Sequence, residues 1–67
     1  MTPEQKAAAI TAWTTLCNAE MQGMLAANAE RARHGHALAY GEQQWEEFCQ
    51  RWDSVIGHNA VIRFFLS

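Results

Sequence analysis

The chain has 67 residues, of which 49% are hydrophobic and 18% are charged, and its formal net charge is −2. This length accommodates one small domain, residues 1–67, and the composition excludes a disordered chain. The acidic balance disfavours general affinity for nucleic acid or anionic membranes, because both require a clustered positive surface. The sequence shows neither a membrane-spanning apolar run nor a secretory signal, so we expect a cytoplasmic protein.

A capping-box pattern marks the start of the first predicted helix. Thr2 occupies the N-cap position, Pro3 the first helical position, and Gln5 lies three residues after the cap. Pro is tolerated at this position because its missing N–H has no helical partner in any case. The pattern predicts a helix that begins at Pro3.

The first helix is expected to run to about Arg33, with one broad apolar face. Its apolar residues, which follow three- and four-residue steps, are Ile10, Trp13, Leu16, Cys17, Met21, Met24 and Leu25. We expect the helix to end at Gly35, because Gly is common just past a helix end. An end near Gly41 is the alternative.

The second predicted helix covers residues 42–56 and has the most regular pattern in the chain. Its apolar positions are Trp45, Phe48, Cys49, Trp52, Val55 and Ile56, and every other position from Glu42 to Ser54 is polar. Gly57 is expected to be the C′ residue, the position past the C-cap at which a glycine commonly ends a helix in the left-handed conformation. Glu47 and Arg51 are expected to form an exposed pair on the outer face.

The C-terminal segment, residues 58–67, has an ambiguous pattern. Val61, Ile62 and the phenylalanines favour a strand, yet no other segment of the chain resembles a strand with which it would pair. A short helix over residues 60–66 is the better interpretation, with Asn59 as a candidate N-cap.

These elements predict an all-α protein in which a long helix and a shorter amphipathic helix form an antiparallel hairpin, followed by a short C-terminal helix. One hairpin seam is too narrow to cover three Trp and three Phe residues. Either the third helix closes a monomer, or two hairpins pair as a homodimeric helical bundle. We favour the homodimer, because small chains without disulfides or metals tend to oligomerise.

The expected protein interface combines the large apolar residues with two charged ones. Its members are Trp13, Glu20, Met21, Met24, Arg31, Trp45, Trp52, Phe64, Phe65 and Leu66. If two copies cross antiparallel near Leu25, Glu20 of one copy approaches Arg31 of the other, and two-fold symmetry repeats the pair. The alternative is that Glu20 lies at the margin of the apolar face and reaches water.

The residues with potential chemistry form one small cluster. Glu30, His34 and His36 have spacing at which a metal ion is conceivable, although solvated side chains at a helix end are the favoured interpretation. Cys17 and Cys49 fall among apolar residues, where a thiol is packed rather than activated. We therefore expect no catalytic residue, no resident metal and no cofactor.

The function expected from the sequence is that of a small non-enzymatic interaction module. Such a chain acts as an inhibitor or adaptor by binding and occluding a larger protein, as the accessory proteins of phages do. Met21 and Met24 are expected first of all to fill the core, and an adaptable binding surface is the alternative for them. The alternative is a metal- or ligand-binding helical protein that uses the Glu30, His34 and His36 cluster.

Overall fold

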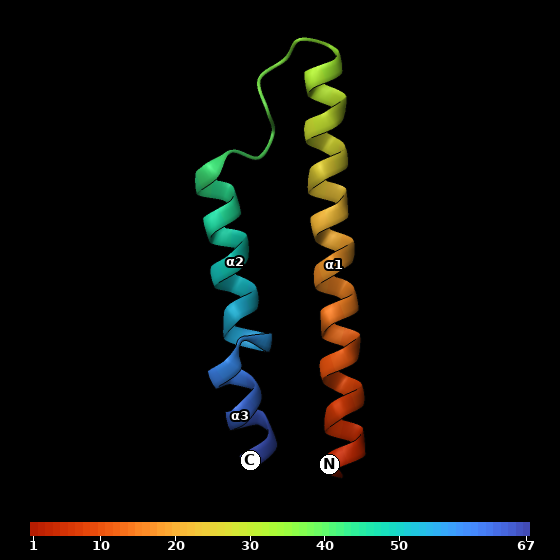
Figure 1. Ribbon diagram of the computed structural model, residues 1–67, viewed down its shortest axis with the longest axis vertical. Helices are drawn as coiled ribbons and strands as arrows, with labels where there is room; N and C mark the ends of the chain where they lie inside the picture. Colours follow the sequence, from red (N-terminus) through yellow and green to blue (C-terminus); the bar gives the residue numbers. More distant parts are fainter.

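The computed structural model describes all 67 residues, and its secondary structure consists of helices with no strand. Helix α1 spans Pro3–Arg33, α2 spans Glu42–Ile56 and α3 spans His58–Leu66. Helix α1 runs alone along one side, whereas α2 and α3 follow each other end to end along the other side, antiparallel to α1 (Figure 1). Both chain ends therefore lie at the same end of the hairpin, and the all-α hairpin expected from the sequence is confirmed.

Both ends of α1 follow the local rules that predicted them. The Thr2 hydroxyl accepts a hydrogen bond from the Gln5 N–H at 3.1 Å, and the Gln5 side chain accepts one from the Thr2 N–H at 2.9 Å. At the other end, Gly35 has a left-handed φ of 72°. The N–H of His36 donates to Arg31 O at 2.9 Å, which closes the helix in a Schellman motif at the predicted glycine.

The junction between α2 and α3 corrects two expectations. Gly57 has extended backbone angles, φ −65° and ψ 164°, and it caps the end of α2 and the start of α3 at once. It is not the left-handed residue expected past the helix end. Because α3 begins at His58, Asn59 lies inside the helix rather than at its N-cap. The helical interpretation of the tail itself is confirmed.

The loop between α1 and α2 is tied to the end of the hairpin by Asn28. Its amide nitrogen donates to Tyr40 O at 2.9 Å, and its amide oxygen accepts from the Tyr40 N–H at 2.9 Å. At the end of this loop, the Gly41 N–H donates to the Gln44 side chain at 2.9 Å and starts α2. These contacts bring α2 back alongside α1.

The interior of the hairpin is very small. Only Met24, Phe48 and Ala60 are buried. The chain exposes 4982 Å², whereas a compact protein of 7.6 kDa exposes about 4300 Å². The Cα atoms span 50 × 19 × 11 Å, so the protein is a single layer of helices with two open faces. Cys49, which we expected to be packed, is consequently exposed, and Cys17 is only partly covered.

Candidate functional site

The apolar surface of the hairpin is the leading candidate for a binding site. The large apolar side chains that remain exposed are Met1, Leu16, Leu25, Leu38, Ile62, Phe65 and Leu66. Trp13, Trp45 and Trp52 are only partly covered. Of the expected interface residues, Met24 alone is fully enclosed, since it lies in the core with 4% of its surface exposed.

Glu20 is held within its own chain. One carboxylate oxygen accepts a hydrogen bond from the Arg51 guanidinium at 2.7 Å, and the other accepts one from the Trp52 indole N–H at 3.2 Å. These contacts correct one expectation, because Arg51 pairs with Glu20 rather than with Glu47. Within one chain the Glu20 carboxylate is engaged by α2, and its approach to Arg31 of a second copy stays a prediction.

This ion pair changes the protonation of its members. The hydrogen bond from Arg51 lowers the pKa of the Glu20 carboxyl group, an effect that partial desolvation opposes and the Trp52 hydrogen bond reinforces. The same contact raises the pKa of Arg51. The pair remains charged at neutral pH and links the middle of α1 to the C-terminal half of α2.

The C-terminal aromatic residues pack against the start of α1. The rings of Trp13 and Phe64 meet edge to face, with centroids 5.1 Å apart, and Phe65 follows with a centroid 6.0 Å from that of Phe64. The Lys6 ammonium group donates to Phe65 O at 3.2 Å and so fixes the end of α3. Leu66 points away from these contacts, with 81% of its surface exposed.

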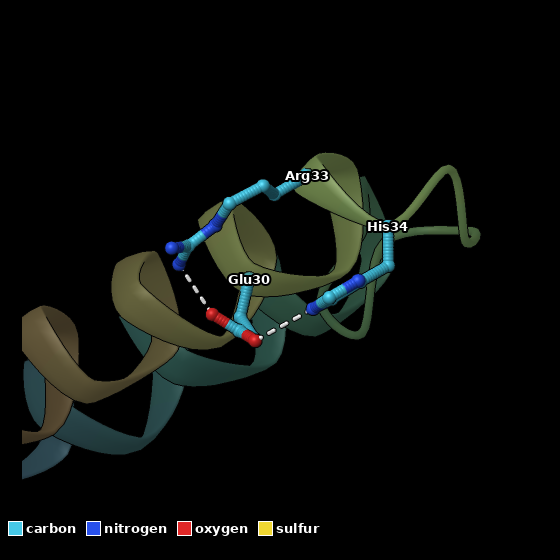
Figure 2. Close-up of polar contacts among 3 residues, drawn as sticks. All are labelled: Glu30, Arg33 and His34. Atoms are coloured by element: carbon cyan, nitrogen blue, oxygen red, sulfur yellow. Dashed lines mark hydrogen bonds and ion pairs between the residues drawn. The ribbon is translucent and has the colours of Figure 1, made fainter.

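Glu30, His34 and His36, the cluster considered as an alternative metal site, are not assembled as a three-ligand site. The Glu30 carboxylate pairs with the Arg33 guanidinium and, at 2.9 Å, with the His34 ring (Figure 2). The rings of His34 and His36 are 6.1 Å apart between centroids. Nowhere in the chain do three His, Cys, Asp or Glu side chains gather with the geometry to hold a metal ion. Glu30 therefore serves as a local partner for the end of α1.

The two open faces of the hairpin differ in charge. At 100° per residue, Glu20 and Leu16 lie on one side of the covered stripe of α1, and Met21 and Leu25 lie on the other. The contact between Glu20 and Arg51 places Arg51 on the first side. The face containing Leu16, Glu20, Arg31 and Arg51 is called the charged face below.

The opposite face contains no charged residue along its centre. Because the helices are antiparallel, the α2 residues on the side away from Arg51 adjoin Met21 and Leu25. This uncharged face consists of Cys17, Met21, Leu25, Trp45, Cys49 and Ile56. At its edge, an open depression of about 490 Å³ lies along α2 and is lined by Glu42, Trp45, Glu46, Cys49 and Gln50.

Comparison with known proteins gives no assignment. The chain matches no protein-family model, no curated protein and no solved structure. Among its helices, none combines the length and apolar character needed to cross a membrane. Its function must be inferred from its own surface.

The structural role of Asn28 was not predicted from the sequence. The sequence shows it only as a polar interruption of the apolar stripe. The structure shows that its amide satisfies both backbone groups of Tyr40. An Asn on the apolar face of a helix, near the end that precedes a loop, is the sequence feature that would have indicated this role.

Proposed function

We propose that this protein is a non-enzymatic interaction module that pairs with a second copy of itself and binds a larger protein by surface contact. It would act as a cytoplasmic accessory or inhibitory protein that occludes its partner. The two free thiols, Cys17 and Cys49, are compatible with a reducing compartment. The alternative use of Glu30 and His34 in metal binding has no supporting observation.

The observation that carries this proposal is the imbalance between apolar content and burial. Nearly half of the residues are hydrophobic, yet three are buried. Exposed Leu25, Leu38 and Phe65 accompany partly covered Trp45 and Trp52. Extended apolar surface of this kind is typical of interaction sites, because leaving it in water is unfavourable.

The shape of the molecule supports association as well. A single layer of helices can bury side chains only along the seam between α1 and its antiparallel neighbours (Figure 1). Stable helical domains usually pack at least two layers around one core. A second layer, supplied by another polypeptide, would cover the side chains that the hairpin leaves in water.

Self-association is tested by sedimentation equilibrium across micromolar concentrations. A mass approaching twice 7.6 kDa supports the proposal, and a monomer at about 100 µM, far above the dissociation constants of specific interfaces, overturns this part of it.

Binding to a larger protein needs a separate test. A photo-cross-linking amino acid at position 66, where Leu66 is the most exposed large side chain, is expected to give an adduct heavier than a dimer in the cells that make the protein. The matched control carries the cross-linker at Thr15, an exposed polar position on the outer side of α1. Equal yields at both positions, or no heavy adduct at position 66, would contradict binding through the apolar surface.

A further inference from the structure

The two faces of the hairpin are not equivalent as docking surfaces. Along the uncharged side of α1, the residues that follow one another at intervals of three or four from Ala7 to Ala32 are all uncharged. On the other side, the pair between Glu20 and Arg51 crosses the seam. Covering that pair would remove two charges from water, which is unfavourable unless new partners replace the water. The uncharged face is therefore the one that is suited to burial.

The area available matches what a dimer requires. The Cα atoms of the whole chain, loop included, span 50 by 19 Å, which corresponds to a layer of about 950 Å², and a specific interface buries about 800 Å² on each partner. A second layer packed at ~8–10 Å between helix axes would complete a four-helix bundle. Burial of most of one face of the hairpin would therefore reach the size of a specific interface.

Charge selects the arrangement of the two layers. The outer edge of α2 beside the uncharged face carries Glu42, Glu46 and Asp53, and none of them forms an ion pair. The corresponding edge of α1 carries the neutral residues Thr14 and Asn18. Packing α2 on α2 of a second copy would bring like charges together, whereas packing α2 on α1 would place the acids beside neutral groups.

We propose that the uncharged face is covered by a second copy of this chain, related by a two-fold axis parallel to the helices, so that α1 of each copy packs on α2 of the other. This inference rests on the self-association proposed above and adds the face and the arrangement. Leu25 of one copy then packs against Trp45 and Cys49 of the other. The charged face remains in solvent.

Two matched leucines test which face is used. Leu25 and Leu16 both lie on α1, with 47% and 59% of their surfaces exposed, but on opposite faces. In sedimentation equilibrium, Leu25→Glu is expected to raise the dimer dissociation constant at least ~30-fold, the size of a hot-spot loss. Leu16→Glu is expected to change it less than about threefold. Disruption by Leu16→Glu alone would overturn the choice of face while leaving self-association intact.

Disulfide trapping tests the arrangement without depending on a destabilised variant. In a Cys17→Ala background, Leu25→Cys is expected to form a covalent dimer with the native Cys49 of a second copy under mild oxidation. Leu16→Cys is the control and should form none. The background protein, which retains Cys49 alone, should also remain uncrosslinked. A covalent dimer through Cys49 alone would place α2 on α2 and overturn the proposed axis. Wild-type protein that is monomeric throughout would overturn self-association itself and, with it, this arrangement.

Discussion

The side-chain amide of Asn28 satisfies both backbone polar groups of Tyr40, through two hydrogen bonds of 2.9 Å each. Twelve residues separate the two, and the loop from residue 34 to residue 41 lies between them. The only other side-chain hydrogen bond between this loop and α1 is the local contact of the His34 ring with Glu30, one turn earlier. The Asn28–Tyr40 pair therefore holds the start of α2 beside α1.

Asn28→Ala is expected to destabilise the protein by ~1–3 kcal/mol, because the Tyr40 N–H and carbonyl lose their partners in a partly buried position. Gln22→Ala is the matched control, since Gln22 is exposed on the outer side of the same helix, away from the seam and from the proposed interface. Urea unfolding followed by circular dichroism, at one protein concentration, measures both. Equal losses in the two variants would contradict a clamping role for Asn28.

Gly57→Ala is expected to lower stability by more than ~1 kcal/mol. A Cβ atom at position 57 would collide with the Asp53 carbonyl and carboxylate, so the α2–α3 junction would have to shift. Thermal unfolding and the helical signal at 222 nm measure the effect. Retention of the wild-type melting temperature would show that the close approach of Asp53 is unimportant.

Gly23→Ala is also a glycine-to-alanine substitution, but it is expected to raise stability rather than lower it. Gly23 lies inside α1, and a Cβ atom there would meet no atom within 4 Å. Replacing a helical Gly by Ala at such a site should raise stability by ~0.5–1 kcal/mol, through the smaller entropy of the unfolded chain. A lower melting temperature for Gly23→Ala would indicate that another molecule approaches α1 at this position.

The acid sensitivity of the fold should depend partly on Glu20. Its pKa is lowered in the folded protein from the usual 4.5, first by the Arg51 hydrogen bond. A lowered pKa means that the folded state favours the carboxylate, so this stabilisation is complete above pH 4.5 and is lost as pH falls through the lowered pKa. Glu20→Gln should therefore be less stable than wild type at pH 7, and the difference should shrink toward pH 3.

Melting temperatures of wild type and Glu20→Gln from pH 7 to pH 3 check this expectation. Glu46→Gln is the control, because Glu46 lies on the outer edge of α2 and has no ion pair. Its curve should run parallel to that of wild type. A constant difference between Glu20→Gln and wild type at every pH would contradict a role for the charged pair.

The local features of this fold were predictable because their causes lie within a few residues of sequence. The cap formed by Thr2 and Gln5 and the helix end at Gly35 depend on contacts no more than five residues apart. The helical extent of α2 followed from its apolar period. Gly57 was misassigned because a glycine after a helix favours a left-handed end, and the immediate start of α3 overrides that preference.

The contacts of the candidate site were not predictable in the same way. Glu20 and Arg51 are 31 residues apart, and their pairing depends on the register with which α2 lies against α1. Apolar periodicity identifies the covered side of each helix but does not fix that register. Cys49 was expected to be packed because it continues the apolar stripe, and it is exposed because one layer of helices covers only the centre of the stripe.

Phe64→Ala is expected to loosen α3 from the start of α1. The Phe64 ring meets Trp13 edge to face at 5.1 Å, and the loss of this partly buried ring should lower stability by ~2 kcal/mol. Leu66→Ala is the matched control, since Leu66 is 81% exposed and its removal should change stability by less than ~0.5 kcal/mol.

Urea unfolding measures the stability of both variants. Fluorescence, with Trp45 and Trp52 replaced by Phe, reports on the surroundings of Trp13 alone. The emission of Trp13 should shift to longer wavelength in Phe64→Ala, because water replaces the ring beside it. Unchanged emission would mean that α3 does not pack against Trp13 in solution. Equal losses of stability in Phe64→Ala and Leu66→Ala would mean that the whole tail, rather than the aromatic contact, causes the effect.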